Sequence, residues 1–321
     1  MWSGELTARG LEAHSSQKTI PDETIYFHPC ANRYSDILCN WAVANQEEQF
    51  CISCACTRTI PDQHFEKNQK RWRDLEMAKR RLFITLLNLN LPIENFTQKE
   101  HGLAFDFLED QRSNPYLELE HVLTGHSQGI ITVNAMEADE GFLHTMKEEM
   151  GESYRTILGH LRHEVGHYYW DILIHTSAQL DKFRELFGDE RQDYGQALEK
   201  YYSKDRPKFR SNLYITKYAS SHPHEDWAET WAHYLHIVDT LETAVSYGVS
   251  SYEPKINDFN DWYSEWARVA QTMNALNRSM GLSDAYPFIL TEVVVDKLRF
   301  IDNLIDDIGL QDTFKPCLPK V

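Results

Sequence analysis

The stretch His163-Glu164-Val165-Gly166-His167 is the most informative part of this chain. On a helix, residues four positions apart project from the same face, one turn apart. Two imidazoles placed in this way can hold one zinc ion, with Zn–N bonds of about 2.0–2.1 Å. A glutamate directly after the first histidine can take a proton from a water on that ion. The motif therefore predicts a helix with His163 and His167 as zinc ligands and Glu164 as general base.

The residues around this motif predict the helix that it requires. From about Tyr154 to about Ile174 the chain contains no proline, and Leu158, Leu161 and Val165 recur at helical spacing. Two histidines and a glutamate inside an apolar stripe are costly to bury without a partner, and a metal ion supplies one.

The third ligand distinguishes the classes of zinc hydrolase. A metzincin would have glycine and histidine where this chain has Trp170 and Leu173, so that class is excluded. The alternative is a glutamate on a second helix downstream, and Pro223 can open such a helix in its first turn. We predict that Glu225 binds the metal. Glu229 shares its helix face and can accept the spare N–H of a ligating histidine.

Five of the six cysteines lie between residues 30 and 56. In a reducing compartment such a cluster is typical of metal binding rather than of disulfides. Four of them can form a structural zinc site of the zinc-ribbon type: Cys30, Cys39, Cys51 and Cys54. Cys56 can replace Cys54, and His28 is a further candidate ligand. Buried free thiols are the alternative, and Cys317 stands apart near the end of the chain.

The composition predicts a globular protein and excludes some partners. Of 321 residues, 42% are hydrophobic and 12% aromatic, which is ample for a packed core. The formal net charge of −17 argues against nucleic acid, because phosphate binding needs basic patches. No stretch approaches the ~18–20 apolar residues of a membrane helix, and the N-terminus lacks the features of a secretory signal. We therefore expect a cytoplasmic protein with no membrane partner.

The order of patterns along the chain predicts its organisation. A loose tail is expected over residues 1–21, a zinc ribbon over 22–62 and a larger domain over 63–321, whose C-terminal helical part begins at about 250. Within the larger domain we expect an amphipathic helix at about 69–89, strands at 104–108 and 129–135, and mainly helices beyond 154. An apolar helical pattern from 290 to 304 predicts packing on the core, and a regulatory lid over the cleft is the alternative.

Three blocks of sequence resemble the bacterial zinc-binding metallopeptidases with an N-terminal zinc ribbon: residues 57–62, 154–171 and 225–236. The likeness extends from about residue 30 to about residue 243. It implies an α+β fold, with a small N-terminal zinc ribbon followed by a mainly helical zincin-like metallopeptidase domain with a short mixed sheet. Many members carry a further C-x-x-C pair near the start, which this chain lacks.

A more distant resemblance is to gluzincins of the lethal-factor type. Their third-ligand helix reads E-x-[FW]-A-E, as Glu225 to Glu229 does here. These enzymes place a tyrosine seven residues before the ligand glutamate, where it stabilises the oxyanion, and the matching residue is Tyr218. An ordinary packed tyrosine is the alternative reading, and Tyr214 and Tyr234 are other candidates for the role.

Together these patterns predict a zinc-dependent metallopeptidase with one catalytic and one structural Zn²⁺. Glu164 would accept the proton of the zinc-bound water, whose hydroxide attacks a peptide carbonyl. The strand at 129–135 can serve as the edge that pairs with an extended substrate, and Asp171 is a further candidate for supporting the ligands. The alternative is a zinc-dependent binding or scaffold protein with a structural or inactive H-E-x-x-H site. The presence of Glu164 argues against it, because a structural site needs no base.

Overall fold

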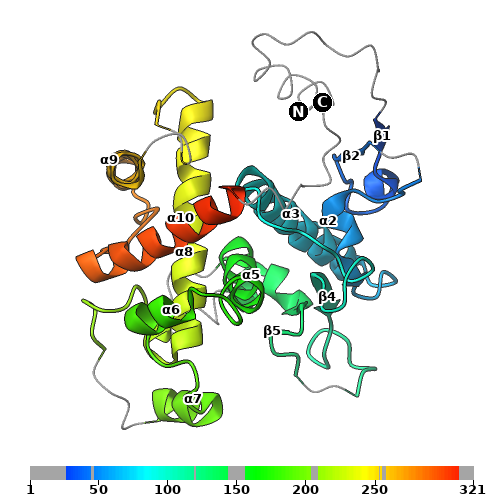
Figure 1. Ribbon diagram of the computed structural model, residues 1–321. Coiled ribbons are helices and arrows are strands. Elements are labelled where there is room, and N and C mark those ends of the chain that lie inside the picture. Colours follow the sequence, from blue (N-terminus) through cyan, green and yellow to red (C-terminus); the bar gives the residue numbers. More distant parts are fainter. Residues whose placement is uncertain are drawn as a thin grey trace.

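The computed structural model places a small cysteine-containing unit beside a larger, mainly helical part built on a short mixed sheet (Figure 1). This architecture confirms the predicted α+β fold class. The predicted tail over residues 1–21 and Cys317 lie outside the residues that the structure describes, which are 27–44, 47–118, 121–143, 156–203, 209–252, 254 and 258–310.

The cysteine-containing unit consists of four short elements: β1 (His28–Pro29), the 3-10 helix η1 (Ala31–Tyr34), β2 (Ala42–Val43) and α2 (Ile52–Ala55). β1 and β2 pair antiparallel. The next strand, β3 (Thr57–Thr59), already belongs to the sheet of the larger part. The chain therefore enters that sheet before residue 62, where the sequence placed the end of the ribbon.

The larger sheet has four strands in the order β3-β4-β6-β5. β4 (Ala104–Leu108) pairs parallel with β3 and with β6 (Ile130–Asn134), and β5 (Gly125–Ser127) pairs antiparallel with β6. The expectation that the strand near 129–135 forms the sheet edge is wrong, because β6 is paired on both sides. The edge strand on that side is β5.

A tight turn explains why β5 pairs with β6. Gln128 and Gly129 both have positive φ, 50° and 83°, as the two central residues of a two-residue hairpin turn require. Position 129 also needs glycine for space, since a Cβ there would lie 2.2 Å from the carbonyl oxygen of His101. The strand itself is only three residues long and lacks apolar alternation, so the sequence gives no strand signal.

Helix α3 (Glu66–Asn88) lies beside the sheet and packs against α5 (Ile157–Leu173), the helix that carries His163 and His167 (Figure 1). Its predicted apolar face is buried: Trp72, Leu75, Leu82, Phe83 and Leu86. The 3-10 helix η2 (Ala135–Ala138), which directly follows β6, packs on the same helix.

Helices α5 (Ile157–Leu173) and α8 (Pro223–Ser246) form the centre of the larger part. The glycine of the motif permits their close approach, because a Cβ on Gly166 would lie 3.1 Å from the Cα of Ala228. The indole N–H of Trp227 donates to the Gly166 carbonyl at 2.8 Å. This contact sets the start of α8 beside the histidines of α5.

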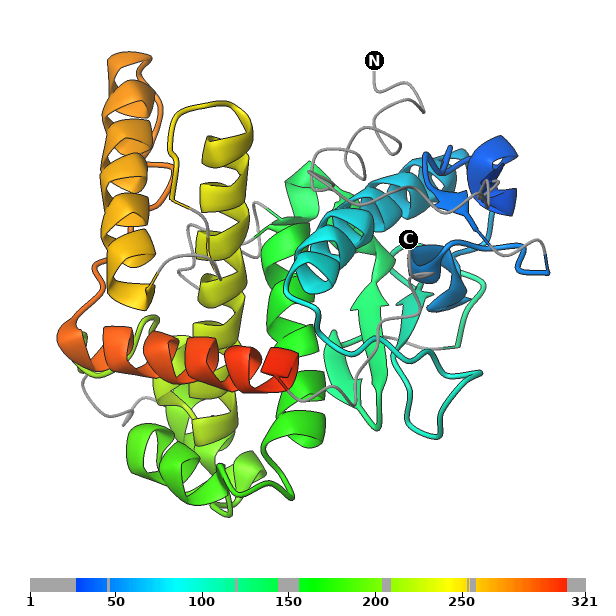
Figure 2. The same ribbon diagram turned by 45° about the horizontal axis from the view of Figure 1, so that its top comes forward.

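The larger part also contains α6 (Leu180–Phe187), α7 (Tyr194–Tyr202), η3 (Tyr218–Ser220), α9 (Phe259–Ser279) and α10 (Glu292–Leu310). Figure 2 shows α9, in orange, beside α8, in yellow. α10 crosses α8 and buries Val294, Leu298, Ile301 and Leu304, so the predicted core-packing role of this helix is confirmed. Among the helices of the described ranges, none has the length and apolar character to cross a membrane.

Candidate metal centres

Helix α5 presents His163 and His167 to one point on its surface. The helix begins after Thr156, whose side chain accepts from the Gly159 N–H at 3.0 Å. The two Nε2 atoms lie 3.3 Å apart. Two nitrogens of a tetrahedral zinc site with bonds of about 2.0–2.1 Å lie about 3.3–3.4 Å apart, so this spacing fits zinc.

Helix α8 brings Glu225 to the same point, and its side chain is 1% exposed. Glu225 Oε2 lies 3.0 Å from His163 Nε2, and Oε1 lies 3.6 Å from His167 Nε2. Oε2 is buried without a hydrogen-bond partner among the described residues. A buried carboxylate oxygen in this state is costly, and a metal ion satisfies it. The three side chains form a group that can hold one ion.

Glu229 lies behind the first histidine, one turn after Glu225. His163 Nδ1 is 2.6 Å from Glu229 Oε1, so the ring donates from Nδ1 and directs the Nε2 lone pair toward His167 and Glu225. Burial lowers the pKa of His163, but the flanking Glu225 and Glu229 raise it well above its ordinary value. The excess negative charge around the ring matches a divalent cation.

Glu164 is buried on α5 beside these ligands. Its Oε1 lies 3.4 Å from His160 Nε2, and His160 Nδ1 lies 2.5 Å from Glu137 Oε2. Burial alone would raise the pKa of Glu164, but the hydrogen bond from His160 and the charge of the nearby histidines lower it to about 2. The carboxylate is therefore in the form that accepts protons.

A cleft of about 360 Å³ opens over this group and is walled by the edge strand β5. His126 of β5 stacks parallel to His167, with ring centroids 6.5 Å apart. Its Nε2 accepts from the Gly129 N–H at 3.0 Å. Asp171, proposed from the sequence as a support for the ligands, lies in the cleft with Oδ2 4.0 Å from His126 Nδ1. Burial raises its pKa.

Two tyrosines reach the cleft. Tyr218, singled out in the sequence, lies with its ring 5.9 Å from that of His163. Tyr194, which sequence reasoning missed, donates its hydroxyl to Glu225 Oε1 at 2.7 Å. The two alternatives to Tyr218 are engaged elsewhere: Tyr214 packs on Lys297, and Tyr234 donates to Asp302.

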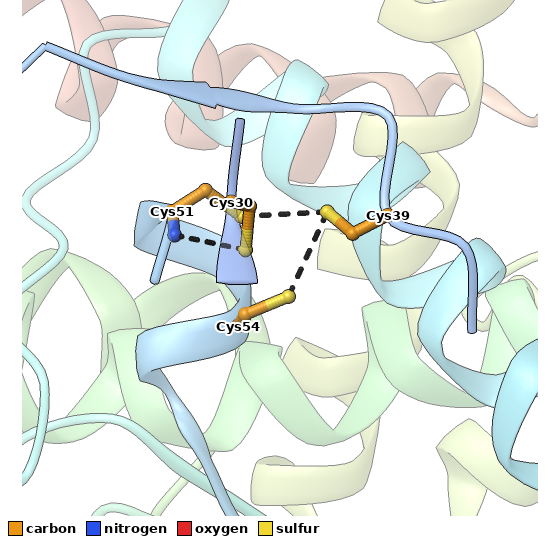
Figure 3. Close-up of side chains that lie close together, drawn as sticks. All are labelled: Cys30, Cys39, Cys51 and Cys54. Atoms are coloured by element: carbon orange, nitrogen blue, oxygen red, sulfur yellow. Dashed lines mark hydrogen bonds between the residues drawn. The ribbon is translucent and has the colours of Figure 1, made fainter. Parts of the chain in front are cut away.

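The four cysteines predicted as ligands converge at the N-terminal end (Figure 3): Cys30, Cys39, Cys51 and Cys54. Each is at most 4% exposed. Cys39 Sγ lies 3.8 Å from Cys51 Sγ and 3.7 Å from Cys54 Sγ. Sulfurs of a tetrahedral zinc site with Zn–S bonds of about 2.3 Å lie about 3.8 Å apart, so these distances fit zinc.

The other candidates lie outside this cluster. Cys56 and His28 are not members of the group that the four thiols form. Burial raises the pKa of the Cys56 thiol to about 12, although Lys79 lowers it, so this side chain is an unreactive part of the core.

Sequence comparisons relate this chain to known protein families. A family model described as "Putative zinc-binding metallo-peptidase" matches residues 68–304, and a model described as "zinc-ribbon domain" matches residues 4–65. Three uncharacterized proteins, one from Mycobacterium bovis and two from strains of Mycobacterium tuberculosis, are each 39% identical over 290 residues, which are 87% of this chain and 83% of the relative. No solved structure matches the chain significantly. The cysteine cluster lies in the zinc-ribbon match, and the histidine and glutamate cluster lies in the other.

Proposed function

This chain belongs to the family described as "Putative zinc-binding metallo-peptidase", and we propose that it hydrolyses peptide bonds with a zinc ion at His163, His167 and Glu225. A second zinc, at the four cysteines, would be structural. The observation that carries the proposal is a group of three atoms beside Glu164, in an open cleft: His163 Nε2, His167 Nε2 and Glu225 Oε2. Among the described residues, that carboxylate oxygen has no hydrogen-bond partner.

The division of roles follows from the surroundings of each side chain. Bound at these residues, zinc would supply Lewis acidity toward a water and a substrate carbonyl. Glu164 accepts the proton of the attacking water on its carboxylate and returns it to the leaving amine. His160, backed by Glu137, contacts that carboxylate and holds it in place. Glu229 fixes the ring of His163 through Nδ1.

Tyr218 is proposed as the donor to the developing oxyanion. Burial and the charge of Glu225 raise its pKa well above the ordinary value, so the phenol keeps its proton and remains a donor. Its ring lies beside His163, on the wall of the cleft.

The edge strand β5 gives the cleft a surface for an extended chain. No strand of the described residues pairs with β5 on the side away from β6, and Gly125 to Ser127 line the cleft. An extended peptide can add to such an edge through main-chain hydrogen bonds. We therefore propose a peptide or a protein segment as the substrate.

The variant Glu164→Gln tests this function. Zinc-loaded wild type should cleave members of a peptide library in a chelator-sensitive manner, as followed by mass spectrometry. Glu164→Gln should retain the zinc but lose cleavage by several orders of magnitude, because an amide cannot accept the proton. Glu66→Gln, at an exposed position at the start of α3, is the matched control and should remain active.

Two outcomes contradict the proposal in different ways. Full activity of Glu164→Gln would place the base elsewhere. A wild type that binds zinc at both clusters but cleaves no peptide would favour a zinc-dependent binding or scaffold protein.

A further inference from the structure

Helix α7 delivers one hydroxyl group to the proposed metal site. Tyr194, its first residue, donates to Glu225 Oε1 at 2.7 Å, while Oε2 of the same carboxylate has no hydrogen-bond partner among the described residues and lies 3.0 Å from His163 Nε2. We infer that Tyr194 is a positioning residue that reserves Oε1 for itself and leaves Oε2 as the single metal-binding oxygen of Glu225. This inference rests on the proposed catalytic zinc site.

The number of oxygens that Glu225 offers matters for the chemistry. A catalytic zinc keeps three protein ligands and one open position. A carboxylate that binds through both oxygens adds a ligand and competes for that position. The hydrogen bond from the Tyr194 phenol uses one of the two acceptor sites of Oε1 and fixes the orientation of the carboxylate, which favours metal binding through Oε2 alone.

The residue that starts α8 also fixes the position of Tyr194. His222 is the N-cap of α8, and its Nδ1 accepts from the His224 N–H at 3.1 Å. The proton of the ring is therefore on Nε2, which donates to the carbonyl of Gln192 at 3.2 Å. The ring of His222 also meets that of Tyr194 edge-on at 5.2 Å. One imidazole thus connects the helix that carries Glu225 to the loop residue Gln192 and to Tyr194, the first residue of α7.

The hydrogen bond from Tyr194 to Glu225 is not a by-product of α7 packing into the core. The helix has no buried residues, and Asp193 caps its start by accepting from the Gln196 N–H at 2.8 Å. Its contacts toward the cleft include the hydrogen bond from Tyr194 to Glu225 and a ring contact of Tyr201 with Tyr218, with centroids 5.9 Å apart. Both the helix and its first side chain are therefore directed at the site.

The test is the zinc affinity of Tyr194→Phe, which removes only the hydroxyl. Competition with a chromogenic chelator, with the cysteine site kept filled, should show about 10–100-fold weaker binding at the site of His163, His167 and Glu225. The control Tyr247→Phe removes a hydroxyl from a 76% exposed tyrosine at the far end of α8 and should bind as wild type does. Thermal unfolding of the variant confirms that it is folded.

A spectroscopic measurement separates positioning from general structural support. Co²⁺ loaded into the site of His163, His167 and Glu225 should give the intense visible bands of four-coordinate geometry in wild type. In Tyr194→Phe the bands should weaken as the second carboxylate oxygen joins the ion. Equal affinity and equal spectra in the two proteins would overturn the inference while leaving the metal site intact. A wild type that takes up only the cysteine-bound ion would overturn both the inference and the proposed site.

Discussion

Loss of the buried ion pair between Asp226 and Lys297 should destabilise the larger part of the molecule strongly. The pair joins α8 to α10, its side chains are 1% and 3% exposed, and Lys297 Nζ lies 2.6 Å from Asp226 Oδ2. The same ammonium donates to the Leu213 carbonyl at 2.8 Å and lies 4.9 Å from the ring centroid of Tyr214. Among the described residues, Asp226→Ala leaves this buried charge beside the Leu213 carbonyl and the rings of Phe187 and Tyr214.

The expected loss of free energy of unfolding follows from the burial of the Lys297 ammonium. Removing one partner of a buried ion pair costs about 3–5 kcal/mol, because the remaining charge is desolvated and uncompensated. Burial raises the pKa of Asp226 to about 7, against the attraction of Lys297, so the comparison is made at about pH 8, where the carboxylate is charged. The double variant Asp226→Ala/Lys297→Met leaves no charge and should recover most of the loss.

Equilibrium urea denaturation of the zinc-loaded proteins measures these free energies of unfolding, and the double-mutant cycle gives the coupling. Asp296→Ala is the control, since Asp296 pairs with Arg299 on the exposed face of the same helix and such pairs contribute about 0–1 kcal/mol. A loss for Asp226→Ala no larger than that of the control would refute the reasoning. So would a double variant whose loss equals the sum of the two single losses.

Three further predictions concern the metal sites and the core. Glu229→Gln should weaken zinc binding at His163, His167 and Glu225 about 10–100-fold in a chelator competition, because the amide holds the His163 N–H less strongly. Cys39→Ser should lower the zinc content by one ion per chain in elemental analysis, and unchanged content would place the ligand elsewhere. Burial raises the pKa of Asp302, which accepts from Tyr234, to about 6, above the ~3.9 of an unfolded chain. The stability that the protonated Asp302 contributes is lost as pH rises through about 6. Between about pH 4.5 and 7.5, the melting temperature of the wild type should therefore fall relative to that of Asp302→Asn. A difference in melting temperature that stays constant over this range would contradict the prediction.

Elements with strong periodicity could be predicted from the sequence. α3, α5 and α8 have apolar stripes at helical spacing, and the strands expected at 104–108 and 129–135 agree with β4 and β6 to within one residue at each end. β5 could not be predicted, because its three residues gain their strand conformation from pairing with β6 through a turn of positive φ. The same omission led to the wrong assignment of the sheet edge.

The candidate site likewise contains residues that the sequence predicts and residues that it does not. His163, Glu164 and His167 meet through the geometry of one helix, and the structure brings Glu225 to them because α8 packs closely on α5 at Gly166.

Tyr194 and His126 reach the site from a short helix and an edge strand, so only tertiary structure brings them there. His160 did carry a signal that was available, since it lies four residues before Glu164 and hence on the same helix face.

An anomalous difference map at the zinc absorption edge tests the central claim most directly. We predict two peaks per chain, one among the sulfurs of the four cysteines and one in contact with His163 Nε2, His167 Nε2 and Glu225 Oε2. Absence of the second peak from zinc-loaded crystals, or a peak bound by other side chains, would contradict the proposed catalytic centre.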